Sequence, residues 1–143
     1  MERRRFVIPP NIFTLEVATR ERTQLIDITT EEVARLVSGS GVDEGICHLY
    51  APHTTAALII NENADPTVVT DILTQLNKQI PFQDVYQHAE GNSAAHIKST
   101  LAGVNQAVFI SGGRLVLGAW QGIFFCEFDG PRHRRVLVKI TFG

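Results

Sequence analysis

The chain has 143 residues, of which 44% are hydrophobic, and its 13 Lys and Arg side chains nearly balance 15 Asp and Glu. A chain of this length buries one hydrophobic core, so we expect a single domain over residues 1–143. The net charge of −2 disfavours nucleic acid as a partner, and no apolar run reaches the roughly 18 residues of a membrane-spanning helix. Cys47 and Cys126 lie in apolar stretches, as reduced core thiols do, so we expect a cytoplasmic protein.

The first third of the chain predicts strands and one short helix. Residues 6–8 indicate an edge strand that two prolines end, and residues 12–19 and 24–28 indicate two more strands. Thr29 followed by Glu32 has the spacing of a capping box, which predicts a helix start.

The middle of the chain predicts two strands and a helix. Residues 45–51 alternate between apolar and polar, whereas residues 56–60 are apolar on both faces, which favours a central strand. Asp65 and Pro66 have the chemistry of an N-cap and a first helical residue, and the helix should end near Pro81. Its predicted buried stripe is Val68, Val69, Ile72, Leu73 and Leu76.

A second long helix is predicted from Ser93 to about Ala102. Asn92 can cap it through its side-chain oxygen, and Gly103 can end it with a positive φ. The residues expected to face the core share one side of this helix and are Ala94, Ile97 and Leu101.

The last third predicts four strands over residues 106–110, 114–117, 119–128 and 135–142. In the third of these, Trp120, Phe124 and Phe128 share a face. Together the elements predict an α+β domain with a mixed or antiparallel sheet and about three helices.

Histidines gather where the apolar patterns break. His88 and His96 flank Glu90 in the stretch before and within the predicted helix, and His53 lies where a strand stops. Loops at strand ends commonly hold function, and imidazole is the commonest protein metal ligand near neutral pH. The spacing matches no zinc signature, so metal binding and ordinary surface histidines both remain open.

An anion site is the second candidate. Asn92 and Ser93 open a helix whose first N–H groups are unpaired, and Lys98 and Arg132 can add positive charge. The alternative is an ordinary capped helix start. Glu62 can either cap its helix or hold a metal-bound water.

Three long motifs resemble those of the YjbQ-like family, described as secondary thiamine-phosphate synthases. They are His53-Thr-Thr-Ala-Ala leading to Asn61-Glu-Asn-Ala-Asp65-Pro, His88-Ala-Glu90-Gly-Asn-Ser-Ala-Ala-His96-Ile-Lys-Ser99, and Leu117-Gly-Ala-Trp120-Gln121 with Glu127-Phe-Asp-Gly-Pro-Arg132. The resemblance implies a sheet curled into a partial barrel and a homotrimer. It also implies a divalent metal, zinc-like, held by His53, His88 and His96 near a subunit boundary, with magnesium as the alternative beside a pyrophosphate substrate.

The same resemblance implies weak formation of thiamine phosphate from a pyrimidine diphosphate and a thiazole phosphate. On that interpretation the protein is a metal-dependent enzyme acting on a small phosphorylated substrate. The residues expected to take part in catalysis are His53, His88, Glu90 and Glu127, and those expected to bind substrate are Asn92, Ser93, Lys98 and Arg132. Two alternatives stay open, a noncatalytic metal- and anion-binding module and a metal-dependent hydrolase.

Overall fold

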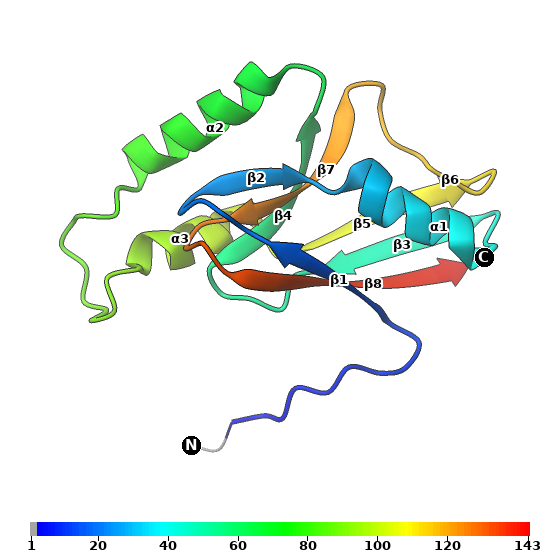
Figure 1. Cartoon of the computed structure of the whole chain (residues 1–143), viewed down its shortest axis with the longest axis horizontal. Helices are drawn as coiled ribbons and strands as arrows, with labels where there is room; N and C mark the ends of the chain where they lie inside the picture. The colour runs from blue at the N-terminus through cyan, green and yellow to red at the C-terminus, as the bar shows by residue number, and fades with distance from the viewer. Residues whose placement is uncertain (1–2) are drawn as a thin grey trace.

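The computed structural model describes residues 3–143 and contains two antiparallel sheets (Figure 1). Sheet A curls into a half-barrel, and its five strands lie in the order β1 (Phe13–Ala18), β8 (His133–Phe142), β3 (Gly45–Tyr50), β5 (Asn105–Ser111) and β6 (Arg114–Leu115). Sheet B has the order β2 (Gln24–Asp27), β7 (Gln121–Glu127) and β4 (Ala56–Glu62). The predicted α+β class and partial barrel are confirmed, and every described strand pair is antiparallel.

The helices lie in two places. A π-helical turn, η1 (Thr29–Ala34), runs into α1 (Arg35–Ser40) at one end of the sheets. The longer helices α2 (Pro66–Gln79) and α3 (Ser93–Ala102) lie together on the side of sheet B that faces away from sheet A (Figure 1). Within residues 3–143 no helix has the length and apolarity needed to span a membrane.

Strand β7 is buried on both faces, because sheet B lies between two apolar clusters. Ile123 and Phe125 pack into the main core between the sheets. Cys126 and Phe128 pack into a smaller cluster with Ala95 of α3. The central strand of sheet B is therefore β7, and the prediction that residues 56–60 form a central strand is wrong. Strand β4 is an edge strand that gains its burial from α3 on one side and from the main core on the other.

Two N-terminal predictions are also corrected. Residues 6–8 form no strand, and the chain before Phe13 runs outside the two sheets and turns at residues 10–12 (Figure 1). The capping box does not form, because Thr29 Oγ1 donates to Asp27 Oδ1 (2.5 Å) and accepts the N–H of Ile123 (2.8 Å). Thr29 thus ties η1 to β7 instead of capping the helix.

Helix α3 presents a different face to the core from the one that its apolar residues predict. Of the predicted stripe, Ala94 is buried, but Ile97 and Leu101 are exposed. Lys98 and Ser99 are buried in their place. Ser99 Oγ donates to the carbonyl of Ala56 in β4 (2.6 Å), a bond that fixes the helix with this face inward. The predicted stripe of α2 does lie on the less exposed side of that helix, but its residues are only half-buried.

Candidate functional site

A polar pocket of about 540 Å³ lies where several distant parts of the chain meet. These parts are the N-terminal segment, the end of β3 with the loop to β4, the start of α3 with the loop before it, and the start of β8. The lining residues are Phe6, Tyr50, Pro52, His53, Thr54, Thr55, Glu90, Asn92, His96, Arg132 and Arg134. Six residues of the predicted site therefore meet in one place: His53, Glu90, Asn92, His96 and Arg132 directly, and Glu127 through its contact with Arg134.

His53 is held by the backbone of β8. The N–H of Arg135 points at Nε2 (3.0 Å), and the ring lies edge-on to Phe125 with centroids 6.3 Å apart. Burial, followed by the Arg134 cation, lowers the pKa of His53, so the ring is neutral at pH 7. The carbonyl oxygen of Arg135 lies at nearly the same distance from Nε2 (3.1 Å), so Nε2 can either accept the N–H or donate to the carbonyl, and the tautomer follows from that choice.

His96 is the histidine that links the pocket to its rim. It lines the polar pocket together with His53, and its ring lies edge-on to that of His88 at 5.4 Å between centroids. His88 itself lies over a neighbouring, more apolar hollow, and its Nε2 is 3.6 Å from Glu90 Oε2. His88 and Glu90 are both exposed, so they form the outer rim of the pocket.

Beneath the pocket lies a buried ion pair between Arg134 and Glu127. Arg134 donates to both Glu127 carboxylate oxygens and to Thr55, while Glu127 also accepts from Thr19 Oγ1 (2.7 Å) and from the N–H of Asp129 (3.0 Å). Burial alone would raise the pKa of Glu127, but the hydrogen bonds from Arg134, Asp129 and Thr19 outweigh it and lower the pKa. With no exposed oxygen, Glu127 is placed to hold Arg134 rather than to contact a substrate.

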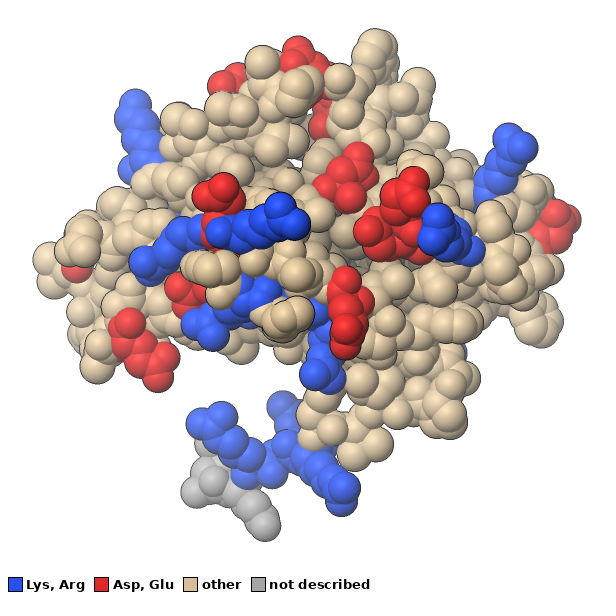
Figure 2. Space-filling model, viewed as in Figure 1, with Lys and Arg blue, Asp and Glu red and all other residues tan. Residues whose placement is uncertain are grey.

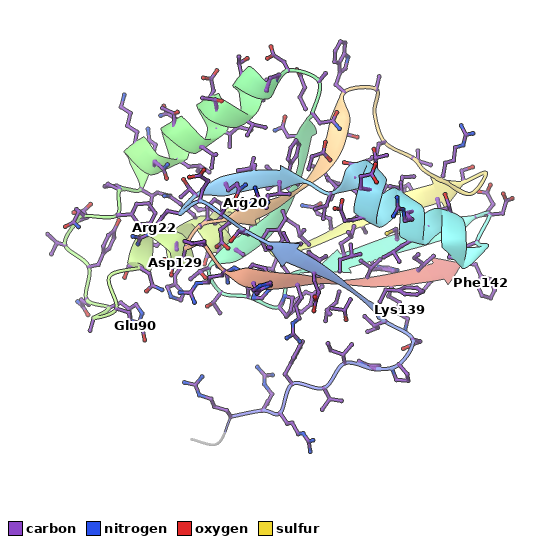
Figure 3. All side chains as sticks on the ribbon, viewed as in Figure 1. Arg20, Arg22, Glu90, Asp129, Lys139 and Phe142 are labelled. Atoms are coloured by element: carbon purple, nitrogen blue, oxygen red, sulfur yellow. The ribbon has the colours of Figure 1, made fainter. Side chains whose placement is uncertain are left out.

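Asp129 connects the polar and charged side chains next to this ion pair. Its carboxylate accepts from Asn92 Nδ2 (2.9 Å) and from Arg132 Nη2 (3.2 Å), and Arg22 Nε lies 3.5 Å away. Figure 3 shows Arg22 and Asp129 side by side, with Glu90 on the loop below them. Because a carboxylate only accepts, the bond to Asp129 also fixes the orientation of the Asn92 amide. Asn92 does not cap α3 with its side chain, and among residues 3–143 its buried Oδ1 has no hydrogen-bond partner.

Two residues predicted to bind substrate lie elsewhere. Ser93 lines the apolar hollow beside His88 rather than the polar pocket. Lys98 is 1% exposed, and its Nζ donates to Asn77 Oδ1 of α2 (2.5 Å). The predicted contact between Lys98 and a phosphate is therefore wrong, because the inward face of α3 directs this side chain away from the pocket.

The side chains do not fit a metal centre made of three histidines. Across residues 3–143 no three His, Cys, Asp or Glu side chains come close enough together to hold a metal ion. His53 and His88 lie on different sides of His96, over different hollows. The interpretation of the chain as a metal-binding protein through His53, His88 and His96 is therefore corrected.

Sequence reasoning missed Arg134 and Asp129 as parts of the site. A signal for Arg134 was present, because it falls in phase with Val136 and Val138, which face the core of sheet A. A charged residue on the apolar face of a strand needs a buried partner, and Glu127 is that partner. Asp129 lies in the motif from Glu127 to Arg132, of which only the two end residues were predicted to belong to the site.

Fold and site together define a small α+β domain whose two antiparallel sheets support a pocket of histidines and arginines. A model of the UPF0047 protein YjbQ-like family matches residues 13–142, so the chain belongs to this family. It is 47% identical to the UPF0047 protein YugU of Bacillus subtilis over 128 residues, which cover 89% of this chain and 96% of YugU. It is 50% identical over 129 residues to the UPF0047 protein MJ1081 of Methanocaldococcus jannaschii, covering 90% of this chain and 93% of that one.

Solved structures agree with the fold. A conserved protein of the YjbQ/UPF0047 family from Clostridium acetobutylicum superposes with a TM-score of 0.88 at 50% identity, covering 90% of this chain and 99% of that one. A protein from Sulfolobus solfataricus, described as of unknown function, gives a TM-score of 0.87 at 33% identity over 92% of this chain and 96% of its own.

These relatives also correct the functional interpretation. None of them is named as a thiamine-phosphate synthase or as a transferase. The family part of the resemblance is confirmed, and the assignment of thiamine-phosphate synthase and transferase activity is withdrawn.

Proposed function

We propose that the protein is an enzyme that acts on a small phosphorylated substrate bound in the polar pocket. One observation supports this most directly: two imidazoles from different elements, His53 and His96, line the same pocket as the arginines Arg132 and Arg134. Proton-transferring and anion-binding groups that converge in one hollow are the usual ingredients of such a site.

Arg132 is the principal anion-binding group in this proposal. Its Nε and Nη2 are directed at Asp129, whereas Nη1 makes no hydrogen bond to any of the residues 3–143, and the side chain is half exposed. The start of α3 adds positive potential from its unpaired N–H groups. The Arg134 charge is largely offset by Glu127, so Arg134 serves to shape the pocket and to keep His53 neutral.

The two histidines supply acid–base chemistry. His53, neutral and hydrogen-bonded to the backbone of Arg135 through Nε2, keeps Nδ1 for a hydrogen bond to a substrate. His96 has no hydrogen bond from its ring to residues 3–143, and so its ring is available to accept or deliver a proton at a bound substrate oxygen. Glu90, which lines the same pocket, orients the histidine pair from the rim.

Binding is tested first, with inorganic phosphate as the probe. Histidine resonances of the wild type, followed by NMR, should shift on titration with phosphate. Arg132→Gln should weaken phosphate binding roughly 5- to 30-fold, the effect of losing one charged hydrogen bond. Arg114→Gln is the matched control, because Arg114 is an exposed arginine of β6, outside the pocket. Equal affinity in all three proteins would contradict the proposed anion site.

Turnover is tested next, with a panel of small phosphate monoesters. His96→Gln should lower the rate of any reaction found by about 10²- to 10⁴-fold, with phosphate affinity changed only slightly. A wild type that binds phosphate but converts no member of the panel would favour the noncatalytic anion-binding module.

We also propose that the chain forms a homotrimer. The support is a set of exposed apolar side chains: Val85 (98% exposed) and Ile97 line the hollow beside the histidine pair, and Leu101 lies one turn further along α3. Closed symmetry is the common way to cover such a surface. Of the three aromatic residues that the sequence places on one face, Phe124 and Phe128 are buried within the chain, whereas Trp120 is exposed. Light scattering should give three times the chain mass, and Leu101→Glu should lower it. A monomer mass for the wild type at micromolar concentration would exclude the trimer.

A further inference from the structure

Lys98 is the charged residue that the proposed site leaves unused. It is almost fully buried on the inward face of α3, and no carboxylate forms an ion pair with it among residues 3–143. Its ammonium group makes one hydrogen bond, to Asn77 Oδ1 at 2.5 Å. Burying an ammonium group is unfavourable unless other interactions offset its lost hydration, so its remaining contacts need an account.

The remaining contact is with an aromatic ring. Lys98 Nζ lies 4.4 Å from the centroid of Phe82, and the guanidinium carbon of Arg22 lies 4.1 Å from the same centroid. Both distances are within the range of cation–π attraction, which is strongest where the cation is desolvated, as it is at Lys98. Two cations from different elements therefore contact one ring, and burial followed by the Arg22 charge lowers the pKa of Lys98.

Phe82 belongs to the segment of residues 81–92 that joins α2 to α3. Most other hydrogen bonds of this segment are internal, such as Tyr86 Oη to the carbonyl of Pro81 (2.6 Å) and the N–H of Val85 to Asp84 Oδ1 (2.7 Å). Its far end is held by the bond from Asn92 to Asp129. The ring of Phe82 is thus the anchor of the near end.

We infer that Lys98 is a positioning residue that, with Arg22, fixes Phe82 and thereby holds His88 and Glu90 of the segment 81–92 against His96. His96 and Lys98 lie on the same turn of α3. His96 points outward, whereas Lys98 points inward and contacts the ring of Phe82, near the start of the segment. The segment is therefore anchored to the helix on which its partner histidine lies. The importance of this arrangement for activity rests on the proposed function, whereas the arrangement itself does not.

The test compares Lys98→Met, which keeps the aliphatic stem and removes the charge, with Lys98→Arg, which keeps the charge. In the wild type, a nuclear Overhauser effect should connect the rings of His88 and His96, whose centroids are 5.4 Å apart. In Lys98→Met this signal should disappear, and cleavage after Glu90 by a glutamate-specific protease should become roughly 5- to 30-fold faster. Lys98→Arg should restore both readouts at least in part.

Lys78→Met is the matched control, since Lys78 is an exposed lysine of α2 and should change neither readout. A folded Lys98→Met protein that keeps the histidine signal and the wild-type cleavage rate would overturn the inference. If Lys98→Met does not fold, Phe82→Leu provides the same test with the same two readouts, because it removes the ring and leaves the lysine in place.

Phosphate titration of the same variants separates this inference from the proposed function. A loosened segment with weaker phosphate binding would support both. A loosened segment with unchanged phosphate binding would support the positioning role of Lys98 and count against a part for Glu90 and His88 in the proposed site.

Discussion

The floor and the rim of the polar pocket use the same kinds of charged group in opposite ways. On the floor, Glu127 is completely buried and Arg134 nearly so. Thr19 and Asp129 donate hydrogen bonds to Glu127, and Arg134 donates to Glu127 and to Thr55. On the rim, the pair of His88 and Glu90 is exposed and 3.6 Å apart. The difference indicates that the floor determines stability and the protonation state of its neighbours, whereas the rim can change without loss of the fold. Over the body of the molecule, the face shown in Figure 2 has basic and acidic side chains intermixed, so local pairing rather than one broad patch determines the charge there.

The largest expected effect is from Glu127→Ala on the floor. Removing the carboxylate leaves Arg134 buried without its partner, which should lower the free energy of unfolding by about 3–5 kcal/mol. Glu90→Ala on the rim should change it by no more than about 0.5 kcal/mol. Urea unfolding of the two variants measures both values. Similar losses in the two would remove the distinction between floor and rim.

A smaller effect is expected from pH, through His53. Because burial and then Arg134 lower the pKa of His53 in the folded protein, the unfolded chain takes up a proton first as the pH falls through about 6.5. The free energy of unfolding should therefore fall between pH 7.5 and pH 5.5, and it should fall less in His53→Gln. Glu127 does not contribute in this window, since its lowered pKa affects stability only below the ordinary glutamate value of about 4.3. Identical pH dependence in wild type and variant would show that His53 is not held neutral.

The smallest expected effect is from Glu90→Gln. Loss of a negative charge that lines the pocket should strengthen binding of inorganic phosphate about 2- to 5-fold, as expected for a solvent-exposed charge, and leave stability unchanged. Titration at low and high salt should show the gain shrinking as salt rises. Weaker binding in Glu90→Gln would instead mean that this carboxylate accepts a hydrogen bond from the ligand.

The sequence was sufficient where local chemistry decides the structure. Asp65 caps α2 by accepting the N–H of Thr67 (2.9 Å), Gly103 ends α3 with φ of 90°, and the alternation of residues 45–50 places Cys47 and Leu49 in the core. Each of these outcomes depends on neighbours in the chain, and so each was visible in the pattern.

The sequence was insufficient where partners come from far along the chain. The inward face of α3 is determined by Ala56, Asn77 and Phe82, which give Ser99 and Lys98 their contacts, and helical periodicity alone does not predict these partners. Grouping of site residues shows the same limit. The motifs identified His53, His96 and Arg132 as site residues. They did not predict that His53 and His88 line two different hollows.

The strand order of sheet A has a consequence for the synthesis of the protein. Strand β8 follows all the other strands in the chain, yet it lies between β1 and β3. Its Val138 is paired with Phe13 of β1 on one side and with Leu49 of β3 on the other. While the ribosome is still translating the region before His133, β1 has no neighbour to pair with, and β3 has only β5. Arg134 is part of β8, so Glu127 has no counter-charge until β8 has been synthesised and has paired. The pocket floor and the half-barrel therefore both need β8 before they are complete, and until then β1 and β3 have unpaired edges, which favour aggregation.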